Sequence, residues 1–281
     1  MRSIVILGAG ELGGALARQL AAADISTRII LVDEAGSVAA GKALDIRQAA
    51  PVDGYVTAVD GTADHAVLVG ADAIVIADRF AAAIEWHDDA GVGLVRTIRQ
   101  LNEQVVVVCA GARQLEMIAR SVRELGVPRQ RIVGSAPDAL RSAIVSMTAL
   151  EAGCSPKDVS LTVVGRPPHQ IIVPWDDAAI AGRRAIDVLS PPALTRLDGR
   201  LARLWPPGPL ALASAATRML TAAATRGRDI VSAFVVTEGG EGERERTGML
   251  PITVGPSGVI SVIVPSLSAR DRVRLETAVQ R

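Results

Sequence analysis

The sequence predicts an α/β protein in which a doubly wound parallel sheet is followed by an α+β lobe. Apolar strand-like runs alternate with helix-like stretches through the first half, which is typical of βαβ crossovers around a sheet buried on both faces. After residue 136 the pattern changes to long helices and paired strands, so we predict two lobes, 1–136 and 137–281. The strands expected in the first lobe cover residues 3–7, 28–32, 55–59, 73–77, 105–109 and 131–133.

The second lobe is expected to begin with a long helix over residues 138–153. Its last helix should start at Ser268, because Ser268 and Asp271 have the spacing of a capping box. Its expected strands cover residues 159–165, 170–173, 230–237, 249–254 and 258–264. Its other expected helices cover residues 178–181, 193–205 and 209–226.

The composition excludes several classes of protein. Hydrophobic residues make up 49% of the 281 residues, and the apolar runs are too short for membrane spans, so we expect a globular protein with no membrane partner. Thirty basic residues balance thirty acidic ones, which argues against nucleic acid as a partner. Cys109 and Cys154 lack a CxxC partner, so neither a disulfide framework nor a metal site is expected. The first apolar run lacks the features of a signal peptide, and a cytoplasmic location is expected.

A GxGxxG motif directly follows the first expected strand. Gly8 allows a tight turn, Gly10 lets the backbone approach a pyrophosphate, and Gly13 lets helix and strand pack closely. The helix that starts at Glu11 and Leu12 would direct its amides toward the anion. The motif therefore predicts a Rossmann lobe that binds a dinucleotide.

The choice of dinucleotide depends on an acidic residue at the end of the next strand. Asp33 lies twenty residues after Gly13, where its carboxylate would accept hydrogen bonds from the adenine-ribose diol. With Glu34 it would repel a 2′-phosphate, so we expect NAD rather than NADP. The alternative is that the glycines only turn a buried βα unit.

Further blocks form a recognisable series along the chain. They are GAGELGGALA at 8–17, GKALD at 41–45, ADAIVI at 71–76, RIVG at 131–134, SPKDV at 155–159 and VP at 173–174. In order, and over nearly the whole chain, they resemble the lactate/malate dehydrogenase family. The resemblance implies an NAD-dependent oxidoreductase acting on a small 2-hydroxy or 2-keto acid, and a homo-oligomer, either a dimer or a tetramer.

The same resemblance implies two arginines on a substrate loop and an asparagine after a strand. This chain departs from both features. In the loop, Ala81 and His87 stand at the positions of the arginines, and Arg79 is the arginine that remains. The asparagine position holds Ala110, followed by Gly111. Arg79 and His87 are therefore the candidate substrate-loop residues. Trp86, beside them, either covers a nicotinamide pocket or packs a loop that no longer closes.

The family also implies an Asp-x-x-Arg helix start, in which the arginine binds a substrate carboxylate. Counting back from residues 155–158 places Leu140 and Ala143 at these positions, whereas Asp138 and Arg141 reproduce the pattern two residues earlier. A two-residue slip rotates a helix by about 200°, so this assignment requires a remodelled entry turn. The alternative is that Asp138 is a helix N-cap.

The last implied residue is a histidine that is paired with that aspartate and protonates the forming alkoxide. His169 lies one or two residues beyond the expected place, and histidine as a residue type is suited to proton transfer near neutral pH. The alternative is an exposed surface histidine. Arg166, in the same segment, could bind an anionic substrate together with Arg79 and Arg141.

Two functions follow from these observations. The first is an NAD-dependent oxidoreductase that uses Asp138, Arg141 and His169. The second is an NAD-binding member of the family that has lost catalysis and acts as a redox sensor or as a subunit of an assembly. A third function, an NAD-dependent sugar hydrolase, would need metal-binding Cys and His residues that we do not find in the sequence.

Overall fold

The computed structural model describes residues 1–81, 84–225, 229–238 and 245–279. The strands of the first lobe are β1 (Ser3–Leu7), β2 (Arg28–Val32), β3 (Ala58–Thr62), β4 (Ala73–Ile76), β5 (Asp78–Arg79), β6 (Ile84–Glu85), β7 (Val106–Cys109) and β8 (Ile132–Gly134). Those of the second lobe are β9 (Val159–Ser160), β10 (Val164–Arg166), β11 (Gln170–Ile172), β12 (Ala179–Ile180), β13 (Arg183–Arg184), β14 (Ile230–Thr237), β15 (Arg246–Gly255) and β16 (Gly258–Val262).

The α-helices differ widely in length and belong to both lobes. They are α1 (Glu11–Ala22), α2 (Gly36–Asp53), α3 (Asp88–Leu101), α4 (Leu115–Leu125), α5 (Ala136–Ala152), α6 (Ala185–Val188), α7 (Pro191–Asp198), α8 (Pro209–Ala224) and α9 (Ala269–Val279).

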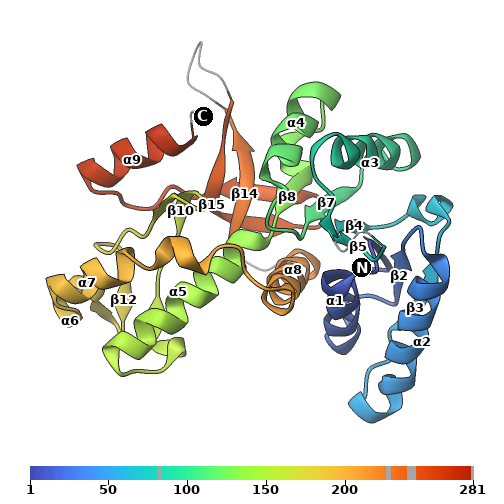
Figure 1. Ribbon diagram of the computed structural model, residues 1–281, viewed down its shortest axis with the longest axis horizontal. Helices are drawn as coiled ribbons and strands as arrows, with labels where there is room; N and C mark the ends of the chain where they lie inside the picture. The colour runs from blue at the N-terminus through green and yellow to red at the C-terminus, as the bar shows by residue number, and fades with distance from the viewer. Residues whose placement is uncertain (82–83, 226–228, 239–244, 280–281) are drawn as a thin grey trace.

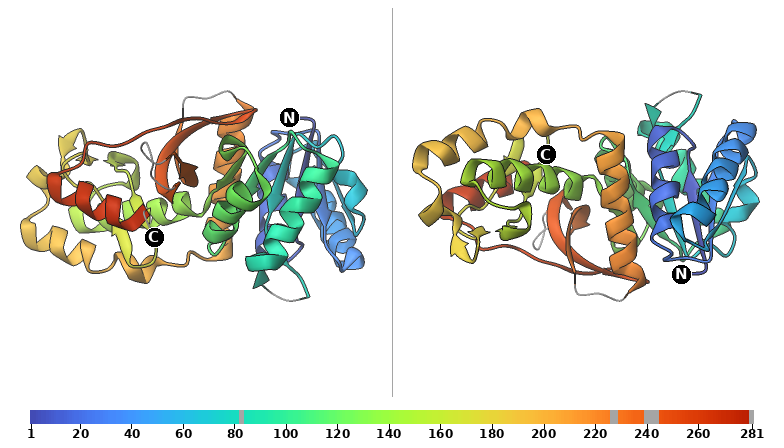
Figure 2. Two further views of the ribbon diagram at one scale, coloured as in Figure 1. Left: turned by 90° about the horizontal axis from the view of Figure 1, so that it is seen from above. Right: turned by 90° about the horizontal axis from the view of Figure 1, so that it is seen from below.

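The first lobe contains six parallel strands in the order β3-β2-β1-β4-β7-β8. Helices α1 and α2 cover one face of this sheet, and α3 and α4 cover the other (Figures 1 and 2). The strands are buried because both faces are covered, which explains their nearly continuous apolar runs. The predicted α/β fold with a Rossmann lobe is confirmed.

The sheet continues into the second lobe through antiparallel strands. Beyond β8 the order is β14, β15, β10 and β11, and β16 pairs with residues 252–255 of β15 on the edge that faces away from β14. The junction is narrow, because β14 pairs with β8 through Phe234 and Gly134. The predicted boundary between residues 136 and 137 falls in the first turn of α5 and stays a prediction.

Several elements differ from the expectation. The predicted strand 159–165 is divided into β9 and β10, and the predicted helix 193–205 is α7 followed by the 3-10 helix Leu201–Leu204. Two further differences have a physical reason in the contacts. The third strand begins at residue 58 rather than 55, because the Asp24 carboxylate accepts hydrogen bonds from the amides of Val56 and Thr57 before pairing with β2 begins. Residues 178–181 do not form a helix. They contain β12, which pairs with β9 and β13, and the left-handed conformations of Ala181 and Gly182 form the turn that follows.

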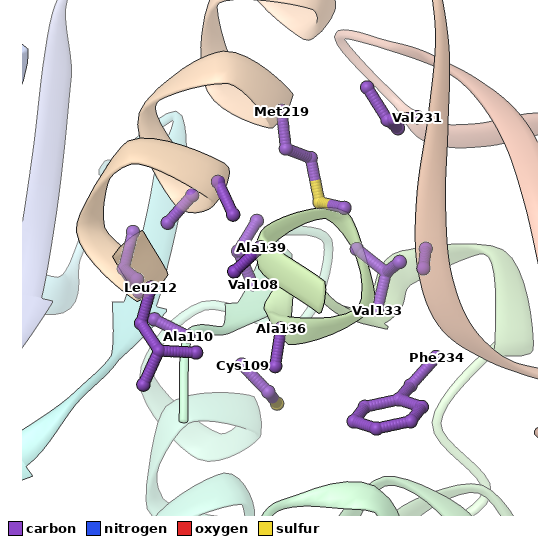
Figure 3. Packing of buried hydrophobic residues seen from close by; sticks show 14 of the residues in the cluster. Val108, Cys109, Ala110, Val133, Ala136, Ala139, Leu212, Met219, Val231 and Phe234 are labelled. Atoms are coloured by element: carbon purple, nitrogen blue, oxygen red, sulfur yellow. The ribbon is translucent and has the colours of Figure 1, made fainter. Parts of the chain in front are cut away.

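The two lobes share an apolar core where α8 packs against α1 and α5. Figure 3 shows Leu212 and Met219 of α8 among buried side chains that include Ala110, Ala136 and Phe234. This packing places the start of α8 near the turn between β1 and α1. The second lobe therefore meets the first at the carboxyl edge of the parallel strands, where ligands bind in open α/β sheets.

Candidate functional site

The glycine motif forms the turn between β1 and α1. Gly8 has a φ of +116°, and a Cβ there would lie 2.3 Å from the backbone oxygen of Asp78. A Cβ on Gly13 would lie 2.0 Å from the backbone oxygen of Gly8. Both positions therefore require glycine, one for the turn and the other for close packing of the helix start. This is the geometry expected of the motif.

The amides at the start of α1 are engaged by an aspartate that the sequence analysis did not single out. Asp78 lies two residues after β4, at the same edge of the sheet as the turn. Its Oδ1 accepts a hydrogen bond from the Gly13 amide at 2.8 Å, and its Oδ2 accepts one from the Leu12 amide at 3.1 Å. A Cβ on Gly10 would lie 2.3 Å from Asp78 Oδ2. The space left by Gly10 is thus filled by a carboxylate.

Asp33 is buried at the end of β2 and is held by main-chain groups. Its Oδ2 accepts hydrogen bonds from the amides of Ala9 at 2.8 Å and Phe80 at 3.0 Å. Its Oδ1 accepts one from Ala35 at 3.0 Å. The carboxylate predicted to bind a ribose diol therefore also connects the glycine turn with the segment that follows β4.

Lys42 contacts the same turn from α2. Its Nζ donates a hydrogen bond to the backbone oxygen of Gly10 at 2.6 Å and lies 5.8 Å from the centroid of the Phe80 ring. A Cβ on Gly14 would lie 3.2 Å from this side chain. Lys42 brings a positive charge to the turn, and its Nζ donates to a carbonyl of the protein.

The expected substrate loop contains a small antiparallel hairpin, β5 with β6, in which Asp78 pairs with Glu85. The Glu85 carboxylate accepts hydrogen bonds from the amides of Ala112 at 3.0 Å and Arg113 at 2.7 Å, in the turn between β7 and α4. A Cβ on Gly111 would lie 2.3 Å from Glu85 Oε2. One carboxylate from each strand thus attaches the hairpin to the body of the lobe.

Arg79, Trp86 and His87 have local partners. The Arg79 guanidinium carbon lies 4.7 Å from the Trp86 ring centroid, and the Trp86 carbonyl accepts a hydrogen bond from Gln114 Nε2 at 3.1 Å. His87 Nδ1 lies 2.6 Å from Asp88 Oδ2, beside the first turn of α3. These contacts support the interpretation that Trp86 packs the loop in place.

A cleft of about 300 Å³ lies between the glycine turn, the hairpin and the start of α8. Glu11, Asp78 and Glu85 contribute carboxylates to its lining, and His87 and Arg113 contribute basic groups. A larger cavity of about 510 Å³ lies beneath α9, away from the glycine turn. The smaller cleft is the candidate site, because it contains the carboxyl edge of the sheet.

Asp138 is a buried ion-pair partner in the first turn of α5, not its N-cap. Its carboxylate accepts hydrogen bonds from Arg141 Nε at 3.1 Å and from Arg218 Nη1 at 2.9 and 2.7 Å. The Ser232 amide adds a further hydrogen bond at 3.2 Å. The Asp-x-x-Arg pair therefore exists. Its carboxylate is also bound by Arg218 of α8 and by the Ser232 amide of β14, so its hydrogen-bonding capacity is filled by groups of the protein.

His169 is exposed in the turn between β10 and β11. It lines a shallow hollow with Arg166, whereas Asp138 lines another hollow with Arg141 and Arg218. The two hollows have no lining residue in common, and β15 lies between β14, which contacts Asp138, and β10, which precedes His169. The structure thus does not bring His169 and Asp138 into one site.

The three arginines proposed to bind an anion lie in separate contacts. Arg166 Nη2 pairs with Glu116 Oε2 of α4 at 3.5 Å, Arg79 packs on Trp86, and Arg141 pairs with Asp138. This arrangement does not form a common anion site.

Cys109 is fully buried at the end of β7, and burial raises the pKa of its thiol, so it is not a nucleophile. Within the described residues, no three His, Cys, Asp or Glu side chains lie together as a metal site would require. Every helix of the described part of the chain is too short or too polar to cross a membrane.

Comparison with known proteins places this geometry in context. No protein-family model matches the chain. It is 29% identical over 290 residues to a malate dehydrogenase of Thioalkalivibrio sulfidiphilus, covering 97% of this chain and 94% of that protein. It is 27% identical over 296 residues to a malate dehydrogenase of Desulforudis audaxviator, covering 99% and 95% of the two chains. These relatives support the resemblance to the lactate/malate dehydrogenase family along nearly the whole chain.

Solved structures of a lactate and a malate dehydrogenase share the fold of this chain. The lactate dehydrogenase of Cryptosporidium parvum, complexed with lactic acid and nicotinamide adenine dinucleotide, superposes with a TM-score of 0.87 at 19% identity and covers 99% of this chain and 94% of its own. The malate dehydrogenase of Salinibacter ruber gives a TM-score of 0.87 at 21% identity, covering 98% and 93% of the two chains.

Ala110, where the resemblance would place an asparagine, lies in an apolar environment. Ala110 has no exposed surface and belongs to the core that contains Leu212 of α8 (Figure 3). An amide side chain there would need polar partners in an apolar core. The alanine is therefore consistent with its surroundings.

Sequence reasoning missed three residues that shape the site: Asp78, Glu85 and Arg218. Asp78 carried a usable signal, because an acidic residue just after a parallel strand lies at the edge where a dinucleotide binds. Glu85 carried none, since its partners lie in the turn after a different strand. Arg218 is 80 residues from Asp138, so only the packing of α8 on α5 reveals the pair.

Proposed function

We propose that this chain is an NAD-dependent dehydrogenase that acts on a small 2-keto or 2-hydroxy acid. The observation that carries the proposal is the similarity to malate dehydrogenases along nearly the whole chain. NAD is indicated by these relatives and by the complex of the lactate dehydrogenase neighbour. Gly8, Gly13 and Asp33 lie at the carboxyl edge, where a Rossmann lobe receives a dinucleotide.

The glycine turn has the residue types that bind a dinucleotide, at the expected positions. Its amides and the Asp33 carboxylate, however, are hydrogen-bonded to other groups of the protein in this structure. The Leu12 and Gly13 amides, which would receive a phosphate, donate to Asp78, and Asp33 accepts from the Phe80 amide. NAD therefore requires a different arrangement of the segment after β4. For this reason we derive no catalytic step through the cofactor.

We assign the catalytic roles to the residues that best match the chemistry of the family. His169 exchanges the proton of the substrate oxygen, Arg141 binds the substrate carboxylate, and Asp138 orients them. Arg79 and His87 belong to the loop over the cleft. In this proposal the β10–β11 turn must approach α5, because His169 and Asp138 line separate hollows.

A second function is favoured by a specific observation: the chain is a family member that binds NAD without turnover, as a redox sensor or an assembly subunit. The Asp138 carboxylate is saturated by Arg141, Arg218 and the Ser232 amide, as in a structural ion pair. The candidate cleft also contains three carboxylates, which disfavour an anionic substrate. For either function we propose a cytoplasmic homo-oligomer, as the family resemblance implies.

The two functions differ in a direct measurement. Purified protein is mixed with NADH and with oxaloacetate, pyruvate or a longer 2-keto acid, and NADH oxidation is followed by absorbance. The first function predicts saturable turnover with at least one acid. A parallel titration follows tryptophan fluorescence with NAD and with NADP. Binding of NAD without turnover on any acid would exclude the first function and support the second.

A further inference from the structure

The glycine turn already holds an anion that belongs to the chain. The Asp78 carboxylate accepts hydrogen bonds from the amides of Gly13 at 2.8 Å and Leu12 at 3.1 Å, which lie in the first turn of α1 and have no partner within the helix. Its Oδ2 also occupies the space that the missing side chain of Gly10 leaves open. A carboxylate resembles a phosphate in charge and in accepting backbone N–H groups at a helix start. Asp78 therefore occupies the place at the helix start where a Rossmann lobe receives a pyrophosphate.

The backbone of Asp78 fixes the side chain in this position. The Gly10 amide donates to the Asp78 carbonyl at 2.9 Å, and a Cβ on Gly8 would collide with the same peptide unit. On the other side Asp78 pairs with Glu85 in the hairpin, and Glu85 is itself bound to two amides before α4. The carboxylate is therefore held by contacts on both sides.

The segment also reaches the other half of the dinucleotide site. The Phe80 amide donates to Asp33 Oδ2 at 3.0 Å, and the Phe80 ring lies 5.8 Å from Lys42 Nζ. Asp78 thus takes the donors that a pyrophosphate needs, while Phe80 supplies a donor to the carboxylate expected to bind the ribose. A dinucleotide must displace both contacts, and its phosphates must approach a negatively charged side chain.

We propose that Asp78 is an internal ligand of the glycine turn that competes with the pyrophosphate of NAD. The proposal rests on the proposed function in one respect, that NAD is the dinucleotide concerned. Its consequence is that the chain binds NAD weakly as long as the 78–80 segment lies on the turn. Removing the carboxylate releases two amides and removes a like charge, so NAD affinity rises.

The test compares NAD titrations of the full chain by calorimetry for the wild type, Asp78→Ala and Asp78→Asn. The matched control is Asp72→Asn. Asp72 lies just before β4, at its opposite end, and its carboxylate accepts the amides of Arg2 and Ser3. Asp78→Ala should lower the Kd for NAD by about ten- to a hundredfold, the range expected for hydrogen bonds to a charged group. Asp72→Asn should leave the Kd unchanged.

An equal or higher Kd in a folded Asp78→Ala variant would overturn the proposal, with folding checked by circular dichroism. A second readout does not depend on NAD: amide hydrogen exchange at Leu12 and Gly13, measured by NMR with and without inorganic pyrophosphate. Faster exchange in Asp78→Ala, slowed again by pyrophosphate, supports the internal ligand even if no variant binds NAD. In that case only the proposed function fails. Equal exchange in wild type and variant would contradict the internal ligand.

Discussion

Replacing Phe234 by alanine is expected to lower the free energy of unfolding by about 3–5 kcal/mol, the usual cost of truncating a buried aromatic side chain. Phe234 has no exposed surface and lies at the narrow junction where β14 meets β8. Its ring packs edge-on against Trp205 at 5.7 Å between centroids, and a Cβ on Gly134 would lie 2.9 Å from it. Truncation to alanine would therefore leave a cavity, and the neighbouring Trp205 and Gly134 could fill it only by moving.

Urea unfolding measures this effect, and Leu150→Ala provides the control. Leu150 is 83% exposed on α5, so its truncation should change the stability by less than about 0.5 kcal/mol. Tryptophan emission should also change in Phe234→Ala, because Trp205 loses its aromatic neighbour. A Phe234→Ala protein as stable as Leu150→Ala would contradict the packing described for the junction.

His169→Gln is expected to lower kcat by about a hundred- to ten-thousandfold in an active preparation, because a positioned acid or base contributes that much to proton transfer. The effect should fall on kcat more than on KM, since glutamine keeps the polarity of the β10–β11 turn. His65→Gln is the matched control, because His65 is exposed on the short helix His65–Leu68 of the other lobe. Unchanged steady-state kinetics in His169→Gln would remove His169 from the catalytic assignment.

The frame of the fold could be predicted from sequence because buried strands are apolar runs bounded by turn residues. β1, β2 and β14 have the expected bounds, and the glycine turn has the expected shape. The short strand β12 could not be predicted, because a two-residue strand has no periodicity and depends on partners elsewhere in the chain. The start of the third strand was predicted three residues too early, because the side chain of Asp24, which is distant in sequence, binds the amides of Val56 and Thr57 before the strand.

The candidate site was less predictable than the fold. Gly8, Gly13 and Asp33 follow a local motif whose geometry comes from the backbone. The contacts of Asp78 and Asp138, by contrast, join residues 65 and 80 positions away in sequence. Such contacts depend on how strands and helices pack, so they were not predicted from the spacing of residues in one segment.

The central claim is that the Asp78 carboxylate takes the place of a phosphate on the glycine turn. A crystal structure of the dinucleotide-free protein at high resolution tests it most directly. We expect the Asp78 oxygens within hydrogen-bond distance of the Leu12 and Gly13 amides, near 3.1 and 2.8 Å. An Asp78 side chain directed into solvent, with water or an ion bound to those amides, would contradict the claim.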